Sequence, residues 1–266
     1  MEKKFTLGII GTGNMASAIL GGVLRGGLIA PAKIVMSDAD PEKLAIAAQN
    51  GVAVTASNRE VAENSEYLIF ALKPQVAPVV FEEIAPVIEA TTVISIMAGI
   101  SIGKLAAALG ERNYARIMPN TPALVGEGMS AVTFSKGYRS QFVIDIFSSV
   151  GSVVELDESL FDAVTSVSGS GPAYVYMFIK AMTQGGVDGG LDAATAKTLA
   201  VKTVIGAAKL AGASPRPLDE LIDAVCSKGG TTIEAVRSFR EDGLEDIVRK
   251  GMAKCKKRSE ELGNAD

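Results

Sequence analysis

The first half of the chain alternates short apolar runs with stretches of helical spacing, and this alternation constrains the fold more than any other feature. After the run at residues 5–10 come "KIVMS", "VAVTA", "YLIFAL", "TVISIMA" and "YARIM". Such spacing is typical of a parallel sheet whose strands are joined by crossover helices. The nearly continuous hydrophobicity of "YLIFAL" and "VISIMA" suits strands that are covered on both faces. We therefore expect an N-terminal doubly wound α/β domain.

A glycine-rich turn follows the first apolar run. In "GTGNMASAILGGVL", Gly11 permits a tight turn, Gly13 lets backbone approach a pyrophosphate at a helix start, and Ala16 replaces the third glycine of the dinucleotide-binding pattern. The pattern predicts a Rossmann-like site for a dinucleotide. Ligands of such sheets bind outside the carboxyl ends of the strands. Those ends carry Ser37 and Asp38, Asn58, Lys73 and Pro74, Ala98 and Gly99, and Pro119 and Asn120.

The choice of cofactor stays open at this stage. Asp38 lies where an acidic residue would bond the ribose 2′-hydroxyl of NAD and repel the phosphate of NADP. Ser37 could instead bind that phosphate, helped by Lys43 or Arg59. The alternative for Asp38 is a structural one, as a turn or cap residue before "DPEKL".

Beyond "VGSVVEL" the alternation stops and helices dominate. "AATAKTLAVKTVIGAAKLA" keeps apolar residues on helical spacing and is rich in small residues, so such helices can pack closely within a domain and against another subunit. We expect residues 1–157 to form the dinucleotide-binding domain. Residues 158–266 are expected to form an all-helical domain that also mediates oligomerisation.

The helical half contains two unusual stretches. In "SGSGPAYVYMF", two glycines and Pro172 disfavour a regular helix, which indicates either a kink between helices or a close approach of backbone to a ligand or another chain. In "SKGGTTIEAV", Thr231 or Thr232 could simply be a helix N-cap, with Glu234 in support. The alternative uses all four central residues: successive N–H groups at the helix start donate hydrogen bonds to a small carboxylate, and the second hydroxyl touches a neighbouring atom.

The composition excludes several classes of function. The chain of 266 residues has no histidine, which removes histidine general bases and metal sites, and its two cysteines show no metal-ligand spacing. A net charge of −4 gives no broad cationic field for nucleic acid or anionic lipid. No apolar run reaches the length of a membrane span, and the apolar N-terminal run, which is broken by glycines, favours a buried strand over a signal peptide. We expect a cytoplasmic protein.

Several motifs in order make the chain resemble the pyrroline-5-carboxylate reductases. They are "IGTGNMA", "ALKPQ", "SIMAGIS", "RIMPNTPALVGEGMSA", "VSGSGPAYVYMF", "SKGGTTIEAV" and "CKKRSEEL". The resemblance covers nearly the whole length. It implies a Rossmann-like domain, a helical domain that interlocks in homodimers, and further assembly into decamers in some members. It implies hydride transfer from NADPH, with NADH possible, to the C=N bond of 1-pyrroline-5-carboxylate, giving proline.

The resemblance also implies site residues. Thr232 matches the threonine whose hydroxyl contacts the ring nitrogen, and Gly230 and Thr231 match the turn whose backbone receives the carboxylate. Glu158 matches an acidic position near the substrate in some members, although it can equally be a charge near a helix start. The implied cofactor contacts are Gly11, Thr12, Gly13, Asn14, Met15, Ser37, Asn58, Leu72, Lys73, Pro74 and Ala98.

Two departures from the family pattern bear on this expectation. Lys228 stands where the family usually has proline before the glycine pair, which frees the turn and adds a positive charge. In "SDADPEK", many relatives have a basic residue after the serine, which bears on the preference for NADPH. The rival functions are another small imine or hydroxyacid reductase on the same two-domain plan and a dinucleotide-binding protein without catalysis. The missing histidine and the "GGTT" turn favour imine chemistry over hydroxyacid chemistry.

Overall fold

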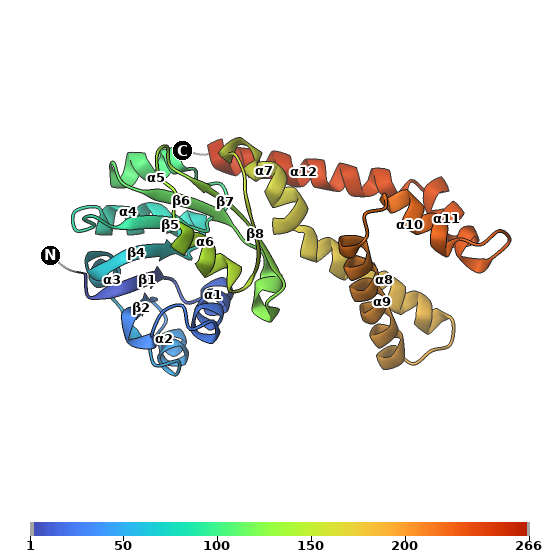
Figure 1. Ribbon diagram of the computed structural model, residues 1–266, viewed down its shortest axis with the longest axis horizontal. Coiled ribbons are helices and arrows are strands. Elements are labelled where there is room, and N and C mark those ends of the chain that lie inside the picture. The colour runs from blue at the N-terminus through green and yellow to red at the C-terminus, as the bar shows by residue number, and fades with distance from the viewer. Residues whose placement is uncertain (1–2, 265–266) are drawn as a thin grey trace. The chain divides into compact units, whose positions relative to one another are not determined.

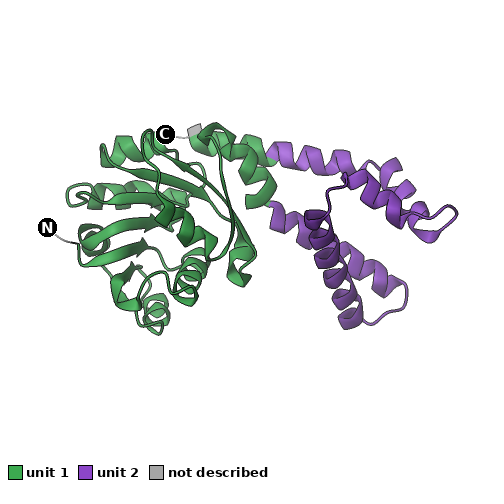
Figure 2. Ribbon diagram, viewed as in Figure 1, with its two compact units in different colours: residues 1–170, 255–266 green, residues 171–254 purple. Residues whose placement is uncertain are grey.

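The protein is described here by a computed structural model covering residues 3–264. The chain forms two compact units (Figure 2): one contains the residues up to Ser170 together with those from Cys255 onward, and the other is Gly171–Lys254. Sequence places the division at residue 158. The division by packing falls later because residues 158–170 and the end of the last helix pack with each other and with the rest of the first unit. Ser259 Oγ donates to Asp162 Oδ1 at 2.6 Å, and a Cβ on Gly99 would lie 3.2 Å from Leu262.

The first unit is built on one eight-stranded sheet (Figure 1) in the order β3-β2-β1-β4-β5-β6-β7-β8. The predicted parallel sheet is confirmed from β3 through β6, where every neighbouring pair is parallel. Strand β7, which runs antiparallel to β6 and parallel to β8, was not expected from the sequence. The strands are β1 (Phe5–Ile10), β2 (Ile34–Ser37), β3 (Ala53–Thr55), β4 (Ser65–Phe70), β5 (Thr92–Ser95), β6 (Tyr114–Met118), β7 (Gly128–Phe134) and β8 (Gly151–Glu155).

Helices cover both faces of the sheet, as the near-continuous hydrophobicity of the strands requires. On one face α1, α2 and α6 pack over side chains such as Ile9 and Ile69, and on the other α3, α4 and α5 pack over side chains such as Leu68 and Phe70. The alternation of Leu68, Ile69 and Phe70 between the faces follows the period of two of a strand. The helices are α1 (Asn14–Arg25), α2 (Pro41–Ala48), α3 (Asn58–Asn64), α4 (Ala77–Ile84), α5 (Ile102–Leu109) and α6 (Gln141–Ser148), with short 3₁₀ turns η1 (Pro31–Lys33), η2 (Pro74–Val76) and η3 (Thr121–Val125).

The stretch "SGSGPAYVYMF" interrupts a helical path. A 3₁₀ turn, η4 (Glu158–Leu160), leads into α7 (Phe161–Val164), a π-helical turn, η5 (Thr165–Gly169), and then α8 (Gly171–Asp188). Pro172 has no N–H to offer the carbonyl of Ser168. The side chain of Asn120 supplies the missing donor, with Nδ2 at 3.0 Å from that carbonyl oxygen. A Cβ on Gly169 would lie 2.5 Å from Met118 Cε, so this glycine allows close approach to the sheet.

The second unit consists of helices that bury little of their apolar surface on themselves. The described residues of α8 include no buried side chain, and α9 (Ala193–Ala213) buries only Ala196 and Ala200. Large apolar side chains stay exposed instead, including Met177 at 72% and Val225 at 67%. Such a surface marks an interface. The remaining helices are α10 (Leu218–Val225), α11 (Thr231–Glu241) and α12 (Leu244–Asn264), whose end from Cys255 belongs to the first unit.

Candidate active site

The glycine turn after β1 has the geometry that a dinucleotide requires. Gly11 has φ +97°, and a Cβ there would lie 2.5 Å from the carbonyl oxygen of Ala71. Gly13, the N-cap of α1, has ordinary extended backbone, and a Cβ there would meet nothing within 4 Å. The first glycine is therefore needed for folding. The second keeps open the space at the helix start where the N–H groups of residues such as Met15 can hold a phosphate.

Asp38 ties the glycine turn to the end of β2. Its Oδ2 accepts hydrogen bonds from both the N–H and the hydroxyl of Thr12, each at 2.8 Å, and its Oδ1 accepts from the N–H of Asp40 at 3.0 Å. Partial burial raises the pKa of Asp38, but the hydrogen bonds from Thr12 and Asp40 outweigh it and hold the pKa below its ordinary value. The N-cap of α2 is Asp40, not Asp38. Asp38 thus has the structural role of a turn residue that fixes the glycine turn.

Ser37 and Asn58 lie together at the carboxyl edge of β2. The hydroxyl of Ser37, which is fully buried, donates to Asn58 Oδ1 at 2.8 Å. Asn58 is the first residue of α3, and its Nδ2 donates to Glu83 Oε2 on α4 at 2.8 Å. The structure thus brings two of the implied cofactor residues into contact. It adds an acidic residue, Glu83, that sequence reasoning missed.

The other implied cofactor residues follow β4 and β5. Leu72 lies against the glycine turn, with its Cδ2 3.2 Å from the position of a Cβ on Gly11. Lys73 is exposed and caps the 3₁₀ turn that begins at Pro74. Ala98 is half-buried, and the residue after it, Gly99, has φ +75°. All the implied cofactor contacts therefore belong to the sheet-containing unit.

Glu158 is engaged inside the sheet-containing unit. Its Oε1 accepts a hydrogen bond from the N–H of Ile102, the first residue of α5, at 2.8 Å and lies 3.0 Å from Nη1 of Arg116. The Arg116 side chain is 9% exposed, and its guanidinium lies over the ring of Phe161, 4.8 Å from the centroid. The role of Arg116 could not be predicted from the sequence, because its partner is 42 residues away. This geometry agrees with a charge at a helix start, the second of the two roles expected for Glu158.

Replacing Glu158 by glutamine is expected to lower the free energy of unfolding by about 1–3 kcal/mol, because the nearly buried Arg116 loses its charged partner. Glutamine keeps an oxygen for the N–H of Ile102. Glu155→Gln is the matched control, since its pair with Arg139 is exposed on both sides and such pairs contribute about 0–1 kcal/mol. Denaturant unfolding measures both. Equal stabilities of the two variants, with a selective loss of activity in Glu158→Gln, would instead favour a role at the substrate.

The start of α11 belongs to the second unit and has no side-chain cap. Its N-cap is Gly230, so neither threonine caps the helix; Thr231 and Thr232 are its first two residues. Within residues 3–264, no hydrogen bond engages the N–H groups or the hydroxyls of these two threonines. The N–H of Gly230, by contrast, donates to the carbonyl of Ser227 at 3.0 Å. The donors left for an anion at this helix start therefore include the N–H groups of Thr231 and Thr232.

The hydrogen bond from Gly230 to Ser227 closes a four-residue turn. Gly229, its third residue, has φ +72°, as a type II turn requires. Lys228 occupies the second position, where proline is favoured because its ring fixes a suitable φ. The departure of this chain from the family pattern therefore falls at a position that would accommodate proline.

Lys228→Pro is accordingly expected to raise the free energy of unfolding by about 0.4–1 kcal/mol, because the unfolded chain loses conformational freedom and the Lys228 N–H makes no hydrogen bond within the described residues. Lys228→Ala is the control, as it removes the same charge without restricting the backbone. Thermal or denaturant unfolding gives the difference. A less stable proline variant would show that the turn needs another backbone conformation.

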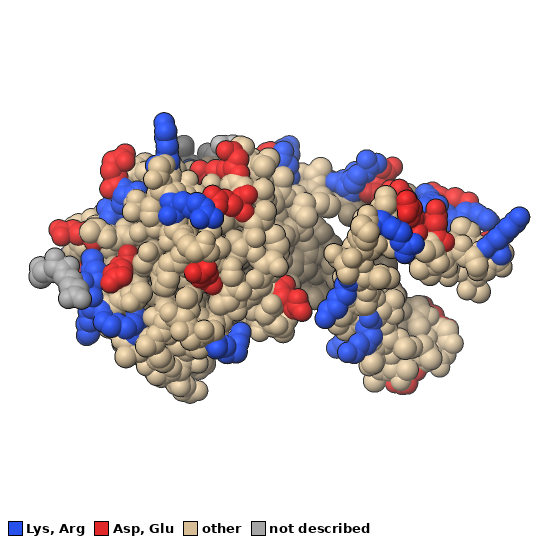
Figure 3. All heavy atoms as spheres, viewed as in Figure 1, with Lys and Arg blue, Asp and Glu red and all other residues tan. Residues whose placement is uncertain are grey.

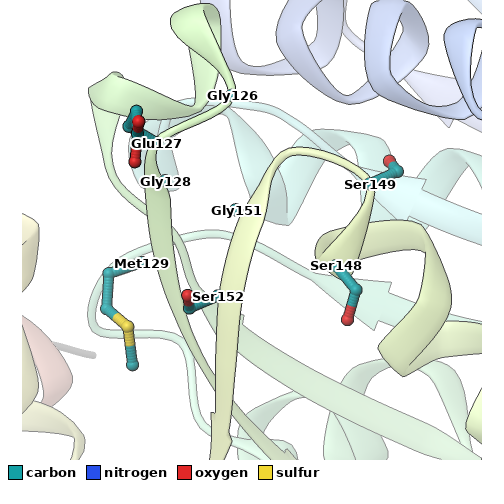
Figure 4. A pocket seen from close by; sticks show the side chains of 8 residues that line it. All are labelled: Gly126, Glu127, Gly128, Met129, Ser148, Ser149, Gly151 and Ser152. Atoms are coloured by element: carbon teal, nitrogen blue, oxygen red, sulfur yellow. The ribbon is translucent and has the colours of Figure 1, made fainter. Parts of the chain in front are cut away.

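A pocket of about 510 Å³ lies elsewhere in the first unit (Figure 4), between the turn that enters β7 and the turn that enters β8. None of the implied site residues lines it.

The surface in Figure 3 shows basic and acidic side chains interspersed over the sheet-containing unit on the visible face. No helix within residues 3–264 is long and apolar enough to cross a membrane, and no cluster of three potential metal ligands occurs in that range. The pocket at the turns that enter β7 and β8 is lined by Gly126, Glu127, Gly128, Met129, Ser148, Ser149, Gly151 and Ser152.

Comparison with protein families divides the chain in two. Residues 6–99 match the family described as NADP oxidoreductase coenzyme F420-dependent, and residues 158–262 match the pyrroline-5-carboxylate reductase dimerisation family. The first match covers the glycine turn and strands β1 to β5. The second covers the helices whose apolar side chains stay exposed.

Individual relatives match over their whole length. The pyrroline-5-carboxylate reductase of Escherichia coli (strain K12) is 40% identical over 271 residues, covering 100% of each chain. That of Pisum sativum is 35% identical, covering 98% of this chain and 97% of the relative. A crystal structure of Plasmodium falciparum pyrroline carboxylate reductase with NADP bound has a TM-score of 0.90 at 30% identity, covering 99% of this chain and 100% of that one.

The open glycine turn on a doubly wound sheet, joined to a helical dimerisation domain, defines a two-domain dinucleotide-dependent oxidoreductase. The full-length identities narrow this class. The chain belongs to the pyrroline-5-carboxylate reductase family.

Proposed function

We infer that the protein reduces the C=N bond of 1-pyrroline-5-carboxylate with NADPH, giving L-proline. The observation that carries this conclusion is the 40% identity over the full length of a curated pyrroline-5-carboxylate reductase. The geometry of the glycine turn fits the cofactor, because Gly13 leaves the space beside the start of α1 open. Of the two open choices of cofactor, NADPH is supported by the relative with NADP bound and by the match to an NADP oxidoreductase family. NADH is the alternative cofactor.

The proposed cofactor site is the edge of the sheet formed by the glycine turn and the strand ends. Gly13, Asn14 and Met15 would hold the pyrophosphate at the start of α1. Gly11 and Thr12, whose N–H groups donate to Ser37 and Asp38, would shape the turn beneath it, and Ser37 and Asn58 would bind the adenosine ribose with its phosphate. Leu72, Lys73, Pro74 and Ala98 would line the remaining length. When bound, the reduced nicotinamide supplies the hydride, so the protein needs no nucleophile of its own, in keeping with a chain without histidine.

The proposed substrate site is the start of α11. The substrate carboxylate would accept hydrogen bonds from the N–H groups of Thr231 and Thr232, which have no partner among the described residues. Gly230 contributes a helix start without a side chain in the way. The hydroxyl of Thr232 would orient the ring nitrogen, which is protonated before reduction. The chain's contribution to the rate is then positioning and electrostatics.

The test is an absorbance assay that follows the reduced cofactor after addition of 1-pyrroline-5-carboxylate, run in parallel with NADPH and NADH. We expect oxidation of the cofactor, faster with NADPH, and formation of proline. An unrelated 2-ketoacid is the control substrate. Oxidation with the ketoacid alone would assign the protein to the hydroxyacid reductases, and binding of the cofactor without any oxidation would make it a non-catalytic dinucleotide-binding protein.

We also propose that the protein assembles as a homodimer through its helical unit, with decamers built from such dimers as the larger form. The exposed apolar side chains of α8 to α10 and the match to a dimerisation family support the dimer. The state of assembly is measured by sedimentation. Analytical ultracentrifugation would separate dimer from decamer.

A cytoplasmic location agrees with the two cysteines, Cys226 and Cys255, both of which are free thiols.

A further inference from the structure

Glu83 forms the end of a directional chain of hydrogen bonds at the edge of β2. A carboxylate only accepts hydrogen bonds, so the atom of Asn58 that faces Glu83 must be the amide nitrogen. The carbonyl oxygen of that amide then faces Ser37, whose hydroxyl must act as the donor. Glu83 thus determines the orientation of Asn58 and commits the only proton of the Ser37 hydroxyl.

This orientation is unfavourable for a phosphate at the same place. One N–H of Asn58 remains for a ligand, and a phosphate oxygen that accepts it would lie within about 5 Å of the Glu83 carboxylate, since both would be acceptors of one amide group. A ribose phosphate monoester has a charge of about −1.5 to −2 near neutral pH. A ribose hydroxyl, in contrast, is uncharged and can donate to a carboxylate.

The surrounding charges do not compensate for Glu83. Two further carboxylates, Asp38 and Asp40, follow β2, whereas the nearby cations are Lys43 and Arg59. Lys43 Nζ is already 3.6 Å from an Asp40 oxygen. Nη1 of Arg59 donates to the backbone carbonyl of Glu83 at 3.1 Å, and the Arg59 side chain is otherwise exposed. These five residues thus have one more negative charge than positive charge.

We propose that Glu83 is a specificity-determining residue that reduces the preference of this enzyme for NADPH over NADH. It acts through its charge beside Asn58 and through the orientation that it imposes on the Asn58 amide. The inference rests on the proposed function in one respect, that the adenosine end of the cofactor lies at Ser37 and Asn58.

The test compares the binding of NADP⁺ and NAD⁺, measured by isothermal titration calorimetry, in the unchanged protein and in Glu83→Gln. The ratio of Kd for NAD⁺ to Kd for NADP⁺ is expected to rise about tenfold in the variant, the size of effect that removal of one charge at this separation produces in a well-hydrated site. Glu82→Gln is the matched control, because Glu82 is the exposed neighbour on the same helix and has the same charge. Its ratio should stay within about twofold of the parent.

Glu83→Ala tests the same charge without an amide that could reorient Asn58, and thermal unfolding checks that both variants fold. Ratios within twofold of the parent in both folded variants would overturn the inference. Because the measurement needs no substrate, it is independent of which imine the enzyme reduces. If the unchanged protein bound neither NADP⁺ nor NAD⁺, the proposed function itself would fail.

Discussion

Replacing Thr232 by alanine is expected to lower kcat/KM for 1-pyrroline-5-carboxylate by about 10- to 100-fold, the value of one hydrogen bond to a charged group. The hydroxyl of Thr232, on the second residue of α11, makes no hydrogen bond to any described residue, so its loss leaves no unpaired group in the fold. The helix itself should be unaffected. Steady-state kinetics with varied imine, at saturating NADPH, measures the change.

Two variants serve as controls for Thr232→Ala. Thr232→Ser keeps the hydroxyl and should keep kcat/KM within a few-fold of the parent, while Ser238→Ala removes an exposed hydroxyl from the same helix and should change nothing. The KM for NADPH should stay constant in all three. Full activity of Thr232→Ala would remove the proposed role, and equal losses in Thr232→Ala and Ser238→Ala would indicate a general effect on α11.

The second large effect concerns the glycine turn. Gly13→Val is expected to weaken NADPH binding by about 100-fold or more, because the added side chain fills the open space where the pyrophosphate would approach the helix start. The backbone of Gly13 is extended, with φ −68°, and no atom lies within 4 Å of the added Cβ. The variant should therefore fold. Calorimetric titration of NADPH together with thermal unfolding separates the two properties.

Gly11→Ala provides the contrast, because Gly11 has φ +97° and an added Cβ would lie 2.5 Å from a backbone oxygen. This variant should lose stability as well as cofactor binding. Unchanged NADPH binding in Gly13→Val would mean that the cofactor does not lie on the start of α1. A folded Gly11→Ala with normal binding would contradict the need for the tight turn.

The parts of the fold that could be predicted from the sequence are those determined by local pattern. Strand β4 is an apolar run covered on both faces. The glycine turn after β1 is formed by a few successive residues, so its pattern is visible in the sequence. Strand β7 was missed. Its sequence, "GMSAVTF", is a short apolar run like those of the parallel strands, and only its pairing with β6 reveals that the chain reverses direction there. That pairing depends on tertiary contacts.

The parts of the site that could not be predicted depend on partners distant in sequence. Asp38 is close to Ser37 in sequence, yet its role became clear only from its bonds to Thr12, 26 residues away. Glu83 reaches Asn58 across 25 residues, and Asn120 reaches Ser168 across 48. For the threonine turn, the sequence indicated a helix start, but the commitment of the Gly230 N–H to Ser227 required coordinates.

The most direct test of the account is a crystal structure of the protein with NADP⁺ and L-proline. We predict that the proline carboxylate accepts hydrogen bonds from the N–H groups of Thr231 and Thr232, that the Thr232 hydroxyl contacts the ring nitrogen, and that the reacting carbon faces the nicotinamide. A carboxylate bound at any other place, with the start of α11 turned away from the nicotinamide, would contradict the account.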